Sequence, residues 1–196
     1  MKKPYLNICL ILFLGFVLNI AYAQNITGKK ALIVISSAGF QDSEFDKVKA
    51  VLDRAGAETK TASISPGQAE GMMGKKVSVD ILLSDADAIK YDAVIFIGGP
   101  GSSQYWNNYL AQQLARDTVN NNRVLAAICL APVTLANAGV LNGKRATVWF
   151  SEADKLTANG ATYTARPVER DGLIITASGP TATDEFAAEI LRALVR

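Results

Sequence analysis

Cys129 is the residue of this chain best placed for covalent chemistry, because it lies where a predicted strand meets a predicted helix. Residues 124–128 form a short apolar run, which is typical of a parallel strand buried on both faces. Residues 130–138 favour a helix that ends at a glycine. Ala127 and Ala131 are small, as a sharp strand-to-helix turn requires where the backbone closes on itself. The pattern predicts a nucleophile elbow that presents the thiol to a cleft.

The predicted helix after Cys129 would direct free N–H groups and a positive dipole end towards the sulfur. Such a position favours the thiolate, which is the nucleophilic form of cysteine. The alternative is a structural cysteine, since a free thiol often packs as a small apolar side chain. The elbow position and the small neighbours favour the functional role.

A Gly-rich turn follows a second predicted buried strand. Residues 93–97 are apolar, and residues 98–101 read Gly-Gly-Pro-Gly. Glycines at the end of a strand let backbone N–H groups approach a ligand closely, although a plain tight turn is the alternative. The turn lacks the Lys-Ser/Thr pair of a phosphate-binding loop.

The remaining pattern alternates strands and helices. Further strands are predicted at residues 31–35, 57–63, 146–150, 161–165 and 173–177, and further helices at residues 43–55, 109–120 and 183–194. This alternation predicts a mostly parallel sheet covered on both faces, with the ligand site beyond the carboxyl ends of its strands. The Gly-rich turn, Cys129 and the helix start that carries Glu44 should meet there.

Three assignments within these elements depend on local patterns. Ser43 is expected to cap the first helix, with Asp46 completing a variant of the capping box. Glu44, in the first turn of that helix, is by itself typical of a surface acid that compensates the helix dipole. Residues 72–73, both methionine, are expected to pack rather than to react.

The N-terminal segment has the pattern of a secretory signal peptide. A short basic start is followed by an apolar run over residues 5–20 and by Ala-Tyr-Ala, a small-x-small cleavage pattern. Asparagines and a glycine interrupt the apolar run, which favours a signal peptide over a membrane anchor. We therefore expect a signal peptide at residues 1–23, cleavage after Ala23, a single domain at residues 24–196, and a periplasmic or secreted protein.

Cleavage would also change the charge and cysteine counts. Loss of Lys2 and Lys3 from the 20 basic residues leaves 18, which equals the 18 acidic residues. A net charge near zero gives no reason to expect nucleic acid or an anionic membrane as a partner. Of the two cysteines, only Cys129 would remain, so a disulfide within the chain is excluded.

The chain contains no histidine. This excludes Cys-His and Ser-His-Asp catalytic groups within the chain, and it excludes a His-ligated metal site. We expect neither a metal nor a cofactor.

Four segments together resemble the ThiJ/PfpI superfamily: residues 40–45, 96–101, 126–132 and 171–180. The resemblance extends in matching order from about residue 29 to residue 195. It implies a flavodoxin-like three-layer α/β/α sandwich related to class I glutamine amidotransferase domains, and it implies a homodimer.

The resemblance also implies roles for four residues. Cys129 matches the elbow nucleophile, and Glu44 matches a glutamate whose carboxyl group hydrogen-bonds the thiol, which reverses the surface role inferred above. The backbone N–H groups of Gly99 and Leu130 match oxyanion-hole donors. The protease and glyoxalase branches commonly carry histidine directly after the cysteine, where this chain has Leu130. Other branches take a histidine from the loop about twenty residues further on, and residues 147–150 supply none. Peptidase activity is therefore not expected.

Three functions fit these residues. The first is a glyoxalase- or hydratase-like reaction on small reactive carbonyl compounds in stress protection, with Cys129 as nucleophile and Glu44 as proton shuttle. The second is a non-enzymatic redox sensor in which peroxide oxidises Cys129 to the sulfinic acid. The third is a binding protein that keeps the fold and has lost catalysis.

Overall fold

The structure is a computed structural model that describes residues 25–195. The predicted signal peptide at residues 1–23 lies outside the described residues. Among residues 25–195, no helix combines the length and the apolar character that crossing a bilayer requires.

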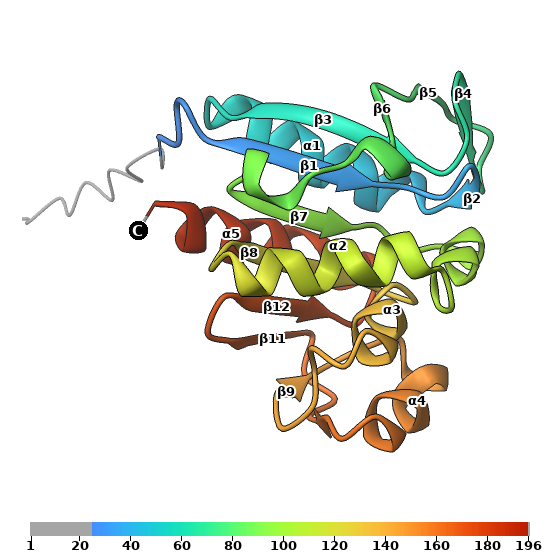
Figure 1. The fold of residues 1–196 in the computed structure, drawn as a ribbon, viewed down its shortest axis with the longest axis vertical. Helices are drawn as coiled ribbons and strands as arrows, with labels where there is room; N and C mark the ends of the chain where they lie inside the picture. Colours follow the sequence, from blue (N-terminus) through green and yellow to red (C-terminus); the bar gives the residue numbers. More distant parts are fainter. Residues whose placement is uncertain (1–24, 196) are drawn as a thin grey trace, which may run out of the picture.

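A seven-stranded sheet forms the centre of the fold (Figure 1). Its strand order is β11-β12-β8-β7-β1-β3-β6, and every pairing is parallel except that of β11 with β12. The strands are β1 (Lys30–Val34), β3 (Glu58–Ser63), β6 (Ile81–Leu82), β7 (Ala93–Phe96), β8 (Val124–Ile128), β11 (Val168–Asp171) and β12 (Ile174–Ala177). The predicted strands at residues 93–97 and 124–128 are confirmed to within one residue.

Helices cover both faces of the sheet, as Figure 1 shows with α2 and α3 in front and α1 and α5 behind. The α-helices are α1 (Asp42–Arg54), α2 (Tyr109–Asn120), α3 (Pro132–Asn137), α4 (Ala153–Ala158) and α5 (Thr183–Leu194). Alternate residues of β1 point to opposite layers: Leu32 packs in the core under α2 and α3, and Ile33 packs in the core under α1 and α5. This burial on both faces explains the unbroken apolar runs, and it confirms the three-layer α/β/α architecture.

Short strands form two further, separate sheets. A three-stranded sheet contains β2 (Ala38–Phe40), β4 (Gln68–Gly71) and β5 (Lys76–Ser78), and a two-stranded sheet contains β9 (Arg145–Ala146) and β10 (Thr162–Tyr163). The 3-10 turns are Leu83–Asp85, Ala88–Lys90, Pro100–Tyr105, Phe150–Glu152 and Pro180–Ala182.

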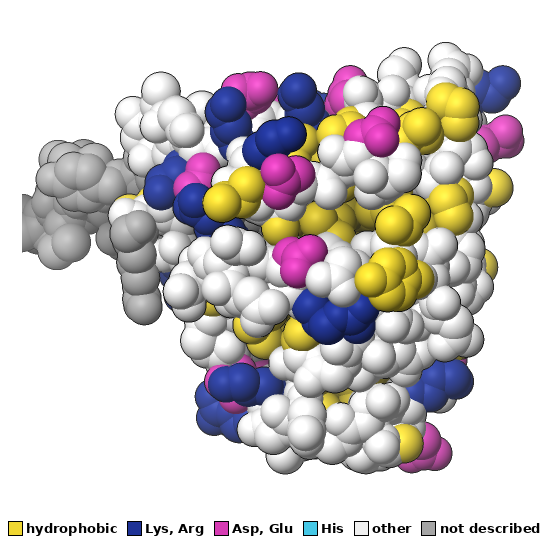
Figure 2. Space-filling view, viewed as in Figure 1, with side chains coloured by type: hydrophobic (Ala, Val, Ile, Leu, Met, Phe, Trp, Pro, Cys, Tyr) yellow, Lys and Arg dark blue, Asp and Glu magenta, His cyan; other side chains and the backbone are white. Residues whose placement is uncertain are grey.

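Charges of both signs are mixed on the face of the molecule shown in Figure 2. In the face shown in Figure 2, Lys and Arg side chains lie beside Asp and Glu side chains, with hydrophobic side chains between them. That face therefore has no broad field of one sign, which nucleic-acid binding would favour.

Two local predictions were wrong. The N-cap of α1 is Gln41 rather than Ser43, because the Gln41 Oε1 accepts from the backbone N–H groups of Ser43 and Glu44 at 2.6 Å and 3.2 Å. The two methionines at residues 72–73 are 48% and 79% exposed, so they do not pack in the core.

The predicted strand at residues 146–150 is also shorter than expected. It ends at Ala146, because the chain leaves the β9–β10 ladder at Thr147, whose N–H donates to Thr176 Oγ1 at 2.9 Å. Two residues later the Trp149 N–H donates to the Cys129 carbonyl at 2.9 Å. This segment is therefore bound to β12 and to the elbow.

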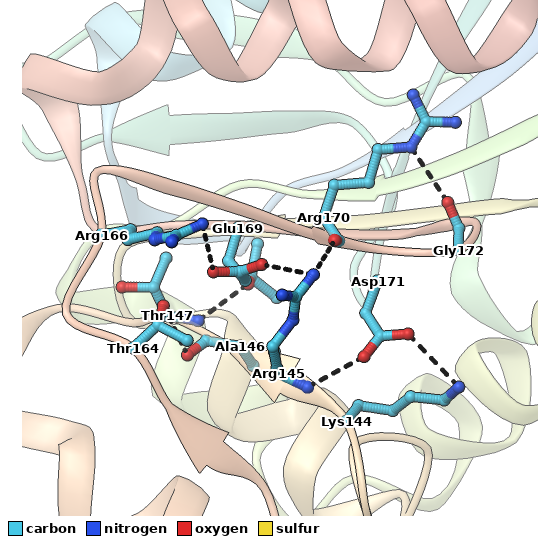
Figure 3. A network of polar contacts seen from close by, with 11 residues as sticks. Lys144, Arg145, Ala146, Thr147, Thr164, Arg166, Glu169, Arg170, Asp171 and Gly172 are labelled. Carbon is cyan, nitrogen blue, oxygen red and sulfur yellow. Dashed lines mark hydrogen bonds and ion pairs between the residues drawn. The ribbon is translucent and has the colours of Figure 1, made fainter.

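An ion-pair network fixes the start of that segment to the sheet edge (Figure 3). The buried Glu169 of β11 pairs with Arg145 at 3.3 Å and with Arg166 at 3.6 Å. The backbone N–H of Arg145 also donates to Asp171 Oδ2 at 3.0 Å. This hydrogen bond is the main reason that the pKa of Asp171 is lowered.

Replacing Glu169 with alanine should lower the free energy of unfolding by about 1–2 kcal/mol. The cost is moderate because Arg145 and Arg166 are 57% and 66% exposed and stay hydrated after the change. Urea unfolding measures the effect. Glu58→Ala is the matched control: it breaks the exposed Lys30 pair at 3.8 Å and should change stability by no more than about 0.5 kcal/mol. Equal effects of the two changes would contradict a structural role for the network.

Candidate active site

The backbone at Cys129 has the geometry of a nucleophile elbow. Cys129 directly follows β8 and has φ of 62°, a left-handed conformation that costs a non-glycine residue about 1 kcal/mol. Two hydrogen bonds hold this conformation: the Cys129 N–H donates to Ala177, and the Cys129 carbonyl accepts from Trp149, both at 2.9 Å. The thiol is 8% exposed.

Glu44 lies beside the thiol and is completely buried. Its Oε2 accepts from the Gly98 N–H at 3.0 Å, and its carboxyl group lies next to the Cys129 side chain, close enough to influence the pKa of the thiol. Its Oε1 is buried with no N–H or O–H donor among the described residues. The structure thus places Glu44 at the thiol and not at the surface, where the helix-dipole pattern alone would put it.

Burial controls the ionisation of Glu44. Desolvation raises the pKa of its carboxyl group to about 8, against the smaller lowering effects of the Gly98 N–H and the Cys129 side chain. Glu44 is therefore mostly protonated at neutral pH, and it ionises as the pH approaches 8.

The Cys129 thiol shows the opposite of the expected thiolate preference. Burial, followed by the charge of Glu44, raises the pKa of Cys129 to about 12. α3 begins at Pro132, three residues beyond Cys129, and proline has no N–H to direct towards the sulfur. The effect of the Glu44 charge applies only while Glu44 is ionised, so the two groups titrate as a coupled pair.

Two backbone N–H groups face the sulfur from different loops. Hydrogen bonds from Gly99 and Leu130 lower the pKa of Cys129, although less than the burial and the Glu44 charge raise it. Gly99 has φ of 98°, and a Cβ atom there would lie 2.5 Å from both the Gln41 nitrogen and the Gly39 oxygen. Only glycine fits this close approach.

Gly98 is equally constrained, because it separates Glu44 from Cys129. A Cβ atom at this position would lie 2.4 Å from the Cys129 Cβ and 2.9 Å from the Glu44 Oε2. The Gly-rich turn is therefore a part of the site and not a plain tight turn.

A pocket of about 260 Å³ opens onto the thiol. Its lining residues come from the loops at the carboxyl ends of the strands and carry no charged side chain: Gln41, Met72, Gly99, Pro100, Cys129, Leu130, Trp149 and Pro180. The Trp149 ring packs so closely over Gly179 that a Cβ there would lie 2.8 Å from the ring. Among residues 25–195, no group of three or more His, Cys, Asp or Glu side chains is arranged to hold a metal ion.

The sequence did not indicate five of these lining residues. Gln41, Met72, Pro100, Trp149 and Pro180 come from five separate loops, and their convergence depends on the tertiary fold. The one available signal was the position of Pro100 and Pro180 directly after glycines that follow strands, since such breaks lie at the ligand-binding edge of a parallel sheet.

The chain belongs to the DJ-1/PfpI family, which matches residues 29–193. It is 38% identical over 174 residues to an uncharacterized protein of Methanocaldococcus jannaschii, covering 87% of this chain and 85% of that protein. The crystal structure of a ThiJ/PfpI domain protein from Brachyspira murdochii superposes with a TM-score of 0.83 at 33% identity, covering 85% of this chain and 98% of that one.

The structure of Drosophila melanogaster DJ-1beta superposes with a TM-score of 0.79 at 31% identity, covering 85% of this chain and 90% of that one. More distant relatives include a glutathione-independent glyoxalase of Caenorhabditis elegans, 28% identical, covering 85% of this chain and 89% of that protein. Another is a deglycase of Pyrococcus furiosus, 26% identical, and the match covers 83% of this chain and 98% of that protein.

The raised pKa of Glu44 predicts a specific dependence of stability on pH. An unfolded carboxyl group ionises near pH 4.5, whereas the folded one stays protonated up to about pH 8. The contribution of Glu44 to the free energy of unfolding is therefore fully present below pH 4.5. It is lost as the pH rises towards 8, because only the unfolded carboxyl group ionises readily in this range. Relative to Glu44→Gln, which cannot ionise, the wild type should lose on the order of 3 kcal/mol of unfolding free energy over this range.

Urea unfolding at a series of pH values measures this difference. Cys129→Ala is the control and should keep most of the dependence, because burial and not the thiol is the largest cause of the Glu44 shift. Parallel stability curves for the wild type and Glu44→Gln would contradict the assignment.

Proposed function

We propose that this protein converts small reactive carbonyl compounds, in a glyoxalase- or hydratase-like reaction at Cys129 and Glu44. The observation that carries the proposal is the contact between a buried thiol and a carboxyl group that ionises near pH 8, beneath two backbone N–H groups. The relatives named glyoxalase and deglycase support a reactive-carbonyl role.

The first step joins Cys129 to the aldehyde carbon of a 2-oxoaldehyde. The ionised Glu44 accepts the thiol proton while sulfur forms the S–C bond, and the carbonyl π bond becomes an oxyanion. The Gly99 and Leu130 N–H groups stabilise that oxyanion. Glu44 then returns the proton to the oxygen, which gives a hemithioacetal and restores the carboxylate.

The second step is an internal proton transfer. Glu44 removes the proton from the carbon bonded to sulfur, and the resulting enediol is protonated at the neighbouring carbon, which gives a thioester of a 2-hydroxy acid. Water hydrolyses the thioester and restores the thiol. In sum, one oxoaldehyde and one water become one 2-hydroxy acid, and no external oxidant or reductant is needed.

Peptide hydrolysis is a poorer fit to the same site. It requires protonation of a departing amine, a role that histidine fills in cysteine peptidases. This chain has no histidine, and Trp149 and Gly179 lie beside the thiol.

Methylglyoxal should be converted to lactate by the purified protein, with kcat/KM rising as the pH approaches 8 because Glu44 must be ionised to accept the thiol proton. Cys129→Ala should form no lactate, and Glu44→Gln should lower kcat about 100-fold or more. Asp46→Asn is the matched control, an exposed acid on the same helix that pairs with Lys75, and it should keep wild-type activity. Lactate formation by Cys129→Ala at the wild-type rate would overturn the proposal.

A redox sensor is the second candidate, and the protonated Glu44 favours it. A carboxylic acid beside the sulfur can donate a hydrogen bond to a sulfinate oxygen. Two molecules of hydrogen peroxide would each transfer one oxygen to sulfur and leave as water. Addition of two oxygens at Cys129, together with no lactate formation, would favour this role over the enzyme.

Export and self-association complete the proposal. The support for export is the sequence pattern of residues 1–23. Sequencing the N-terminus of the periplasmic or secreted protein tests it, and the expected first residue is Gln24. The family resemblance implies a homodimer, and analytical sedimentation of the mature chain would measure its molar mass and test this.

A further inference from the structure

The pocket beside Cys129 is apolar beyond its reacting groups. The side chains of Met72 and Trp149 are 48% and 38% exposed at its wall, and Leu130 and two prolines add further apolar side chains. No described lining residue carries a charge. An anionic substituent would therefore lose hydration in this pocket without gaining a cationic partner.

The hydrogen-bonding groups of the pocket are almost all donors. The carbonyl oxygens of the three lining residues nearest the reaction are already engaged: that of Gly99 with Ser102, that of Cys129 with Trp149, and that of Leu130 with Trp106. The N–H groups of Gly99 and Leu130 face the sulfur.

Gln41, the one uncharged amide side chain in the lining, adds a further donor. Its Oε1 caps α1 by accepting from Ser43 and Glu44, so the atom of its amide group that remains for a ligand is Nε2. A ligand that matches this pocket carries hydrogen-bond acceptors and an apolar group, and it carries few hydroxyl donors.

We propose that the substrate is a neutral vicinal dicarbonyl whose substituent is apolar and larger than methyl, such as an aryl or branched alkyl oxoaldehyde. The Gly99 and Leu130 amides bind the oxygen of the attacked aldehyde, Gln41 Nε2 binds the second carbonyl oxygen, and the substituent lies between Trp149 and Met72. Hydroxylated and anionic carbonyl compounds are poor substrates. This selectivity rests on the proposed reaction, whose bond changes are the same for every 2-oxoaldehyde.

The kinetic test compares phenylglyoxal, methylglyoxal and hydroxypyruvaldehyde. Burying a phenyl group in place of a methyl group should raise kcat/KM about tenfold or more, and the hydroxylated compound should fall below methylglyoxal. Trp149→Ala and Met72→Gln should each reduce the phenylglyoxal-to-methylglyoxal ratio of kcat/KM at least threefold. Tyr109→Ala, which removes an aromatic ring 70% exposed and outside the pocket lining, should leave the ratio unchanged.

A binding test separates the pocket from the reaction. In Cys129→Ala protein, phenylpropanedione and butanedione present the same two acceptors with a phenyl or a methyl substituent. Calorimetry should show about tenfold tighter binding of phenylpropanedione. Trp149→Ala in this background should remove most of the preference.

Each outcome has one meaning. Turnover of methylglyoxal at a rate equal to or above that of phenylglyoxal overturns the proposed selectivity and leaves the proposed function intact. No turnover of any oxoaldehyde, with phenylpropanedione bound preferentially, overturns the proposed function and retains the pocket selectivity. Equal binding of the two diketones overturns the selectivity whatever the kinetics show.

Discussion

The site depends on one interaction, the contact between the buried carboxyl group of Glu44 and the thiol of Cys129. Glu44 is fully buried, so the charged form of its carboxyl group is costly and its pKa rises to about 8. Cys129 cannot become a thiolate easily next to a negative carboxylate, so its own pKa also rises. The pair therefore releases its first proton near pH 8, which suits the proposed reaction, in which Glu44 both accepts and returns a proton.

The fold supplies the constraints that keep this contact in place. Glu44 is 85 residues away from Cys129 in the chain, and parallel strands bring both to the same edge of the sheet. Gly98 lies between them with no room for a Cβ atom, and its N–H donates to the carboxyl group. Gln41 fixes the start of α1, and the Trp149 N–H holds the elbow carbonyl. Three segments from different parts of the chain therefore hold one pair of side chains in place.

Much of the fold was predictable because burial on both faces leaves an apolar run with clear ends. Residues 124–128 were predicted as a strand and form β8 with the same bounds, and residues 183–194 form α5. Glu44 was not identifiable from its local pattern, since an acid in the first turn of a helix is usually at the surface. Its burial results from the approach of Gly98, which only the tertiary structure shows. The ionisation of Cys129 was mispredicted for a related reason: burial and a neighbouring acid outweigh the amide donors.

The protonation of Glu44 at neutral pH is the central claim, and difference infrared spectroscopy tests it most directly. The spectrum of the wild type minus that of Glu44→Gln should show the carbonyl stretch of a protonated carboxylic acid at pH 7. This band should be replaced by carboxylate bands as the pH rises through about 8. A difference spectrum that shows only carboxylate bands at pH 6 and above would contradict the account, because Glu44 would then be an ordinary ionised acid beside the thiol.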